Sequence, residues 1–280
     1  MFVWLASYPK SGNTLTRSLL AAYFFSEDGI FNFELIKNIK QFPKTELFSK
    51  MGIDIKNEKE VIKNYIRVQE IINEKKNIQF LKTHSYLFNF ENNPFTNLEN
   101  SLGVIYIARD PRNIILSYAN HNSKTQEESA KDLIKGRLLG EDDHNQINIY
   151  PGTWGGNFNS WKSFKNVNKY LLVKYEDLIK DKEKSFYEIL KFIYNLKKVD
   201  FNFDKKKFQN VIESTSFERM QDLEKNEGFD ESMLDNKTGK KIKFFSLGKK
   251  RNWKGTLKEK IKNQIELAFK KEMQELGYLK

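Results

Sequence analysis

The 280-residue chain contains no cysteine, which excludes a disulfide-stabilised scaffold, a thiolate metal site and a cysteine nucleophile. It also lacks long hydrophobic runs: its apolar stretches are far shorter than the roughly 18 residues that a membrane-spanning helix needs. The first ten residues, MFVWLASYPK, have no basic region ahead of the apolar stretch, so they predict a core strand rather than a signal peptide. These absences favour a cytoplasmic protein that does not span a membrane.

Lysine and arginine together number 48 against 37 aspartates and glutamates, which gives a formal net charge of +11 at pH 7. A basic surface is typical of proteins that bind nucleic acids or other polyanions. Only seven of these cations are arginines, and the many lysines accompany an excess of asparagine and isoleucine, as an A/T-rich genome would impose. The charge alone therefore predicts no nucleic-acid partner. The few arginines are more informative, because a planar guanidinium suits bidentate phosphate binding.

Short apolar segments that are typical of buried strands alternate with helical patterns along the chain. Strands are predicted at 2–8, 78–82, 103–108 and 170–175, and helices at 14–25, 58–75, 112–120, 126–139, 156–167, 184–196 and 256–279. This alternation predicts an α/β fold in one domain over 1–280, with a parallel sheet flanked by helices. Ligands then belong at the carboxyl ends of the strands. Residues 224–243 lack apolar periodicity and are predicted to form a surface loop.

The segment SYPKSGNTLTRSLL at 7–20 lies directly between the first strand and a helix. Ser11, Gly12, Asn13 and Thr14 are small or polar, so their backbone N–H groups can converge on an anion at the helix N-terminus. Lys10 stands at the mouth of this loop. The order is not that of a Walker A loop, because the lysine precedes the glycine. An ordinary strand-to-helix turn capped by Thr14 is the alternative.

Two further segments place polar residues after strands. In GVIYIARDPRNIILSYANH at 103–121, Arg109 follows a strand and Ser117 lies in the next helix, although Asp110 and Arg112 would also suit a solvated helix start. The segment FLKTHSYL at 80–87 places Lys82, Thr83 and His84 at another strand end. A lone histidine is more often structural than catalytic. Three strand ends that deliver cations or a base to one edge nevertheless form a convergent site.

These residues carry a family resemblance. YPKSGNTL resembles the 5′-phosphosulfate loop of sulfotransferases that use 3′-phosphoadenosine 5′-phosphosulfate (PAPS), and ARDPRNIILSY resembles their 3′-phosphate motif. Four more segments are similar to this family in the same order: FLKTH, PGTWGGNFNSWKSF with YLLVKYEDL, STSFERM, and SLGKKRNWKG. The resemblance spans residues 3–255. It implies the phosphosulfate-binding strand–loop–helix of that family, which is P-loop-like.

The resemblance implies a role for each matching residue. The 5′-phosphosulfate would be held by Lys10, Ser11, Gly12, Asn13 and Thr14, and the 3′-phosphate by Arg109 and Ser117. His84 is implied as the catalytic base, Lys10 and Lys82 as contacts to the reacting groups, and Tyr175, Thr215 and Phe217 as the adenosine wall. Gly248 stands in the terminal loop of the 3′-phosphate site, with Lys249, Lys250 and Arg251 after it as the cations expected to complete the charge.

The sequence departs from the family pattern at two places. Leu15 stands where many members have a tryptophan beside the adenine, so Phe217 must supply more of the stacking. Ser246 and Leu247 replace the usual Arg-Lys before Gly248. The dimerisation motif that often follows this loop is hardly recognisable, which leaves the choice between a monomer and a homodimer open.

Sulfuryl transfer requires positioning and charge stabilisation at the attacking and leaving oxygens, as phosphoryl transfer does. A neutral His84 near an ordinary pKa of about 6.5 can take the acceptor's proton. Lys10 can stabilise the leaving phosphate. No metal is expected, and the acceptor is predicted to be a hydroxyl or amine of a small molecule or glycan. Residues 85–100 and 121–155 are the expected acceptor walls. The alternatives are a nucleotide or small-molecule kinase and a basic RNA- or polyanion-binding protein.

Overall fold

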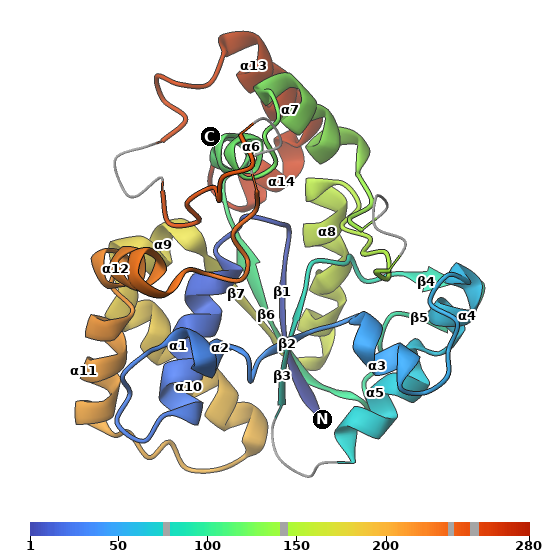
Figure 1. The fold of residues 1–280 in the computed structure, drawn as a ribbon, viewed down its shortest axis with the longest axis vertical. Helices are drawn as coiled ribbons and strands as arrows, with labels where there is room; N and C mark the ends of the chain where they lie inside the picture. The colour runs from blue at the N-terminus through green and yellow to red at the C-terminus, as the bar shows by residue number, and fades with distance from the viewer. Residues whose placement is uncertain (75–78, 141–144, 235–237, 247–251) are drawn as a thin grey trace.

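The computed structural model describes residues 1–74, 79–140, 145–234, 238–246 and 252–280. Its centre is a five-stranded sheet in the order β2-β3-β1-β6-β7, with every neighbouring pair parallel (Figure 1). The strands are β1 (Phe2–Ser7), β2 (Lys40–Gln41), β3 (Gln79–Thr83), β6 (Ser101–Ala108) and β7 (Tyr170–Lys174). A small antiparallel pair, β4 (Asn89–Phe90) and β5 (Asn93–Pro94), lies outside it. The predicted parallel α/β fold is confirmed, and the four predicted strands correspond to β1, β3, β6 and β7.

Helices cover both faces of the sheet, because side chains of alternating residues along each strand point to opposite faces. In β1, Trp4 joins one apolar cluster while Val3 and Leu5 join the other. The cluster of Val3 includes residues of α1 (Asn13–Phe25), α10 (Lys182–Lys197), α11 (Lys205–Ser214) and α12 (Phe217–Glu227). The cluster of Trp4 includes residues of α5 (Tyr65–Asn73), α8 (Trp154–Trp161), α13 (Glu259–Ala268) and α14 (Lys270–Glu275). The central strand β1 is therefore buried on both faces.

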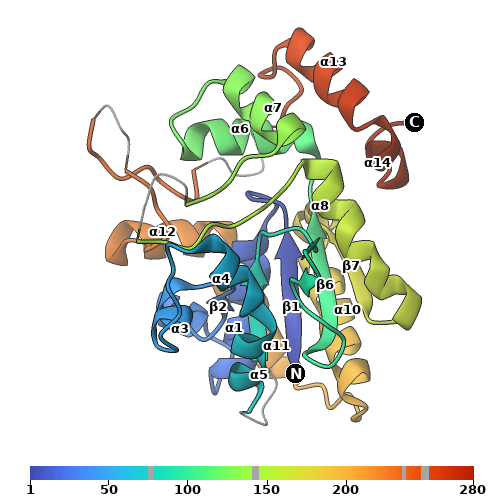
Figure 2. The same ribbon diagram turned by 90° about the vertical axis from the view of Figure 1, so that its right-hand side faces the viewer.

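The register brings the carboxyl ends of the central strands to one edge. Ala6 in β1 is opposite Thr83 in β3, and Ser7 is opposite Ile107 in β6. Figures 1 and 2 show α6 (Pro111–His121), α7 (Gln126–Lys135), α13 and α14 gathered beyond this edge. The remaining helices are α2 (Phe33–Ile36), α3 (Thr45–Ser49), α4 (Glu58–Lys63), the 3-10 helix η1 (Lys162–Val167) and α9 (Tyr175–Lys180). In the described ranges, each helix is too short or too polar to cross a membrane.

Several predicted helices are divided or shorter in the structure. The helix expected over 58–75 is interrupted at Asn64, whose ψ of 3° departs from helical geometry. The C-terminal helix is divided into α13 and α14 at Phe269, with φ −123° and ψ 26°. α7 ends before Gly136, which has a positive φ of 78°, rather than at residue 139. α8 continues only as the 3-10 helix η1. Apolar periodicity survives such breaks because the same face stays buried on both sides.

The surface loop predicted over 224–243 begins only after residue 227, and its described remainder contains no helix. Residues as far as Glu227 belong to α12, and Phe229 beyond it is buried. The Glu224 carboxylate accepts hydrogen bonds from the backbone N–H groups of Phe244 (2.6 Å) and Phe245 (3.0 Å). One carboxylate of α12 and the contact of Phe229 with Phe33 of α2 thus hold this segment against neighbouring helices. They leave no periodic pattern that sequence analysis could detect.

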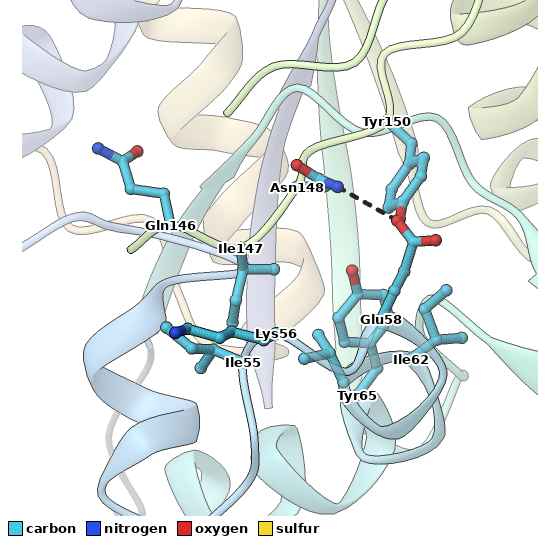
Figure 3. Close-up of a pocket in the computed structure, with 10 residues that line it drawn as sticks. Ile55, Lys56, Glu58, Ile62, Tyr65, Gln146, Ile147, Asn148 and Tyr150 are labelled. Carbon is cyan, nitrogen blue, oxygen red and sulfur yellow. Dashed lines mark hydrogen bonds between the residues drawn. The ribbon is translucent and has the colours of Figure 1, made fainter. Parts of the chain in front are cut away.

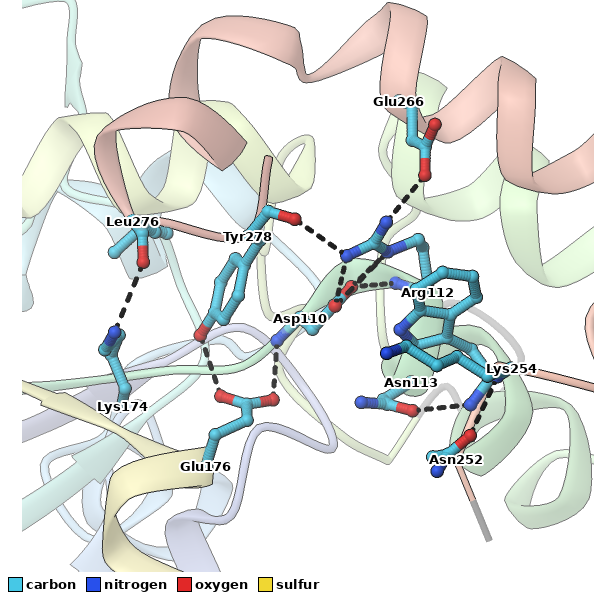
Figure 4. Close-up of polar contacts among 11 residues, drawn as sticks. Asp110, Arg112, Asn113, Lys174, Glu176, Asn252, Lys254, Glu266, Leu276 and Tyr278 are labelled. Atoms are coloured by element: carbon cyan, nitrogen blue, oxygen red, sulfur yellow. Dashed lines mark hydrogen bonds and ion pairs between the residues drawn. The ribbon is translucent and has the colours of Figure 1, made fainter. Parts of the chain in front are cut away.

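The start of α6 fastens the C-terminal part of the chain to the sheet edge (Figure 4). Arg112 and Asp110 are both buried and form an ion pair at 2.7 Å, which corrects the alternative that they are merely solvated. The Arg112 guanidinium also donates to Glu266 of α13 (2.6 Å) and to the carbonyl oxygen of Tyr278 (3.0 Å). It lies 4.0 Å from the centre of the Trp253 ring. Arg112 is therefore a structural residue, because its guanidinium N–H groups bond to other parts of the protein.

Candidate functional site

The loop between β1 and α1 depends on a glycine for two separate reasons. Gly12 has a φ of 99°, a left-handed conformation that side chains rarely adopt. A Cβ at this position would also come within 2.3 Å of the Tyr175 ring. Helix α1 begins at Asn13 with Gly12 as its N-cap and without a side-chain cap. The alternative in which Thr14 caps the helix is therefore wrong. The first N–H groups of α1 have no side-chain cap.

Asn13 and Ser11 fix the loop while keeping polar atoms unused. The Asn13 side-chain amide donates to the carbonyl oxygen of Leu5 (2.9 Å) and to Ser7 Oγ (3.1 Å), which ties the start of α1 back to β1. Asn13 Oδ1 and Ser11 Oγ are buried without a partner among the described residues, as are Arg17 Nε and Arg109 Nε. Buried polar atoms normally have partners, so such a group of them at one loop favours a polar ligand there.

His84 follows β3 and reaches across to the end of β1. Its Nδ1 lies 2.9 Å from the Ser7 carbonyl oxygen and 3.2 Å from Ser7 Oγ. Burial, and secondarily the charge of Lys82, lower the pKa of His84 from its ordinary 6.5 to about 3. The expectation of an ordinary histidine pKa is therefore wrong. His84 is neutral at physiological pH.

The two lysines at this edge are desolvated. Lys10, with a positive φ of 65°, places its Nζ 4.0 Å from the centre of the Phe244 ring. The pKa of Lys10 is lowered from 10.5 to about 7, chiefly by burial and also by the positive charges of Arg109 and Lys82, while the negative charge of Glu231 opposes the shift. Burial also lowers the pKa of Lys82, again with Glu231 acting in the opposite direction. The site thus holds a concentration of positive charge in a poorly hydrated environment.

Arg109, directly after β6, joins the loop to the wall formed by Tyr175. Its Nη1 donates to the carbonyl oxygen of Lys10 at 2.9 Å, and its guanidinium lies 4.4 Å from the centre of the Tyr175 ring. Ser117 lies in α6 and is half-buried. The structure therefore brings Arg109 directly to the loop, whereas Ser117 approaches from the helix that follows.

The expected adenosine wall comes from three helix boundaries. Tyr175 begins α9, Thr215 is the C-cap of α11 and Phe217 begins α12. The Thr215 hydroxyl is buried; it donates to the Val211 carbonyl oxygen at 2.7 Å and accepts from Lys182 Nζ at 3.5 Å. Gly248, Lys249, Lys250 and Arg251, which were predicted to complete the 3′-phosphate site, lie outside the described residues.

Comparison with known proteins decides the family. The family model described as a sulfotransferase domain matches residues 2–277, which is nearly the whole chain. The chain belongs to the sulfotransferase domain family. The predicted resemblance is confirmed, and the family favours sulfuryl transfer over the kinase and polyanion-binding alternatives.

Solved structures share the fold of this sulfotransferase. Mouse sulfotransferase SULT7A1 complexed with PAP is 19% identical, with a TM-score of 0.58 over 98% of this chain and 84% of that chain. Retinol dehydratase with retinol and PAP is 18% identical, with a TM-score of 0.62 over 98% and 81%. The same enzyme with androsterone and inactive cofactor PAP is 18% identical, with a TM-score of 0.59 over 98% and 80%. At these identities the likeness concerns the fold.

Sequence analysis missed three polar residues at this candidate site. Asn157 of α8 donates to the carbonyl oxygens of His84 (2.9 Å) and Pro151 (2.8 Å), while its Oδ1 accepts from the Tyr106 hydroxyl (2.8 Å). Arg17 and Glu231 form an ion pair beside the loop. Helical spacing could have indicated Arg17, which lies three residues after Thr14 on the same side of α1. Nothing local distinguishes Glu231.

A shallow pocket of about 50 Å³ lies on the side of the expected acceptor walls (Figure 3). Glu58 of α4 faces Tyr150 and Asn148 across it; the Tyr150 hydroxyl hydrogen-bonds to Glu58, and Asn148 Nδ2 donates to Glu58 at 3.2 Å. Tyr150 is close to the strand end that bears His84, because its carbonyl oxygen accepts from the Tyr86 N–H at 2.8 Å. The walls expected at 85–100 and 121–155 thus meet a third segment, 55–65, that was not predicted.

No three His, Asp or Glu residues in the described ranges form a group that could hold a metal ion.

Proposed function

We propose that this sulfotransferase moves the sulfuryl group of PAPS to a hydroxyl or amine of a small-molecule or glycan acceptor. The observation that carries this proposal is the meeting of Lys10, His84 and Arg109 at one sheet edge. Each follows a different strand, and Arg109 bonds directly to the Lys10 carbonyl oxygen. Cations that converge with an uncharged base suit a reaction between an anionic donor and a protonated nucleophile.

The chain's own residues fit such a donor. Lys10 to Thr14 would hold the 5′-phosphosulfate, because the loop leaves helix N–H groups and the buried Ser11 Oγ and Asn13 Oδ1 without partners in the described chain. The proposed 3′-phosphate contacts are Arg109 and Ser117, completed by Gly248, Lys249, Lys250 and Arg251. The proposed adenosine wall is Tyr175, Thr215 and Phe217.

The donor supplies a sulfuryl group activated by its bond to phosphate. His84 is proposed as the general base, with its Nε2 taking the proton that the acceptor hydroxyl or amine releases. Lys10 would stabilise the negative charge that develops on the phosphate as it leaves, and Lys82 would contact the sulfuryl oxygens. No step in this scheme requires a metal ion from the protein.

The acceptor is proposed to enter from the side of Tyr86 and Tyr150. One solved relative binds retinol and androsterone, which are small apolar alcohols, and this supports a small acceptor here. The aromatic residues Phe88 and Phe90 lie in contact with Tyr150, at ring distances of 5.6 and 6.2 Å. Screening pools of alcohols, phenols, sugars and amines with labelled PAPS, with products identified by mass spectrometry, would find the acceptor.

The donor assignment is tested by calorimetric titration with 3′,5′-bisphosphoadenosine (PAP) and with 5′-AMP. Charge-assisted hydrogen bonds are worth about 1.5–3 kcal/mol each, so PAP should bind at least about tenfold more tightly than 5′-AMP. Arg109→Ala should remove most of this preference. Since Arg109 also holds the Lys10 loop, Ser117→Ala is the second variant and should reduce the preference without disturbing the loop. Arg219→Ala, on the exposed side of α12, is the control.

Equal affinity of the wild type for PAP and 5′-AMP would overturn the assignment. Turnover that depends on ATP and magnesium, instead of PAPS, would point to the kinase alternative. Binding that ignores adenosine nucleotides and weakens uniformly with salt would point to a polyanion-binding protein.

A further inference from the structure

The carboxylate of Glu231 lies inside the proposed donor site. Its Oε1 accepts from Arg17 Nη1 at 2.5 Å and from Lys82 Nζ at 3.4 Å, and its Oε2 accepts from Thr14 Oγ1 at 3.3 Å. Burial opposes the ionisation of this carboxyl, but Lys82 and Arg17 overcome the opposition and hold its pKa well below the ordinary value. Three donors from α1 and β3 therefore bind one anionic group.

The carboxylate of Glu231 leaves one buried donor nearby without a partner. Arg17 is buried, with only 6% of its side chain exposed, and its Nε has no partner in the described part of the chain. Lys10 lies close enough for its pKa to be lowered by Lys82 and Arg109. An arginine fork, a lysine and a hydroxyl around one point match the several terminal oxygens of a sulfate-like group better than the two of a carboxylate.

Two of these three donors already belong to the proposed donor site. Thr14 is part of the phosphosulfate loop, and Lys82 is the proposed contact to the sulfuryl group. Arg17 lies one helical turn after Thr14, on the same side of α1, and meets the same carboxylate. The Glu231 oxygens thus stand in for anionic oxygens at the place where the proposed function puts the reacting group.

We propose that Arg17 is a further donor-binding residue, which holds the sulfuryl group of PAPS together with Thr14 and Lys82 in the position that Glu231 takes in the donor-free protein. This inference rests on the proposed function. Glu231 then acts as an internal competitor of the donor. PAPS must displace its carboxylate, whereas PAP, which has no sulfuryl group, needs to disturb it less.

The test compares the affinities for PAPS and PAP, measured by calorimetry without acceptor, in Glu231→Gln and in Glu231→Gln with Arg17→Met. The double variant is used because Arg17→Met alone would leave a buried carboxylate short of a partner. Glu231→Gln should bind PAPS several-fold more tightly than the wild type, with a smaller gain for PAP. Adding Arg17→Met should weaken PAPS binding at least about tenfold, the value of one charge-assisted hydrogen bond, and PAP binding much less.

Asp230→Asn and Arg219→Met are the matched controls, because Asp230 is adjacent to Glu231 but 87% exposed and Arg219 is an exposed arginine of α12. Both should keep wild-type affinities.

If the double variant is too unstable to measure, Arg17→Lys in the Glu231→Gln background replaces it. This variant should lose part of the PAPS affinity, because lysine keeps the positive charge but not the planar fork of donors. Equal losses for PAPS and PAP, or unchanged PAPS affinity on removal of Arg17, would overturn the inference. A wild-type preference for PAP over 5′-AMP would still stand in that case, which separates this failure from failure of the proposed function.

Discussion

The Nδ1 atom of His84 lies 2.9 Å from the carbonyl oxygen of Ser7. A carbonyl oxygen can only accept, so Nδ1 carries the proton and Nε2 carries the lone pair. The strand end of β1 therefore fixes the tautomer of a residue that follows β3. This is the tautomer that a general base acting through Nε2 needs.

His84→Ala should lower kcat by about 10²–10⁴, the usual contribution of a general base. PAP affinity should stay near the wild-type value, because the base acts on the acceptor. Steady-state kinetics with the identified acceptor and calorimetry with PAP give both numbers. Wild-type turnover at neutral pH in this variant would show that His84 is structural.

The pH profile of kcat/KM for PAPS, which reports the free enzyme, should lack an acid limb near pH 6.5. The pKa of His84 is lowered to about 3, so its neutral form persists as the pH falls through the ordinary histidine range, and activity is lost only near the lowered value. The profile must be corrected for enzyme that unfolds in acid, for example from circular dichroism at each pH. A half-maximal kcat/KM at pH 6.5 with folded enzyme would contradict the lowered pKa.

Lys10 should take up a proton when the donor binds. Its pKa is about 7 in the donor-free protein, and an adjacent phosphate raises it, so PAP affinity should fall as the pH rises from 7 to 9. Calorimetry at pH 7.5 in buffers with different ionisation enthalpies measures this uptake. Lys10→Met should abolish it and lower kcat more than donor affinity, whereas exposed Lys225→Met should change neither. A raised KM with unchanged kcat would make Lys10 a binding residue only.

Asn157→Ala should lower kcat about tenfold, because the side chain holds the backbone at His84 through a bond worth about 1 kcal/mol or more when buried. PAP affinity should not change, since Asn157 touches none of the proposed donor contacts. Asn159→Ala, an exposed position on the same helix, is the control. A loss of thermal stability with unchanged kcat would show that Asn157 serves the fold and does not position His84.

Arg112→Met should destabilise the protein by about 3 kcal/mol, because it leaves the buried Asp110 carboxylate without its ion-pair partner. Chemical denaturation followed by tryptophan fluorescence measures the change in the free energy of unfolding. Arg219→Met should be neutral. A variant as stable as the wild type would mean that solvent or another cation replaces the guanidinium.

The sequence by itself determined the loop and four of the five strands of the sheet; the two-residue strand β2 was not predicted. Apolar runs such as Phe2–Ser7 and Ser101–Ala108 predict buried parallel strands because both faces of such a strand are covered. The loop from Lys10 to Thr14 follows from residue types alone, since Gly12 permits the left-handed turn. The same local signals could not locate helix breaks, which depend on how each end packs.

The tertiary structure alone decided the charges and partners at the site. His84 looks like an ordinary histidine in the sequence, and its pKa is lowered only because folding buries it near Lys82. Arg112 looks solvated beside Asp110, but α13 and Tyr278 close over it. Glu231 is one of many acidic residues in a charged segment, and it becomes a ligand of Arg17 because two positions 214 residues apart meet at the edge of the sheet. Desolvation and long-range contact set these properties, and both arise only when distant segments pack together.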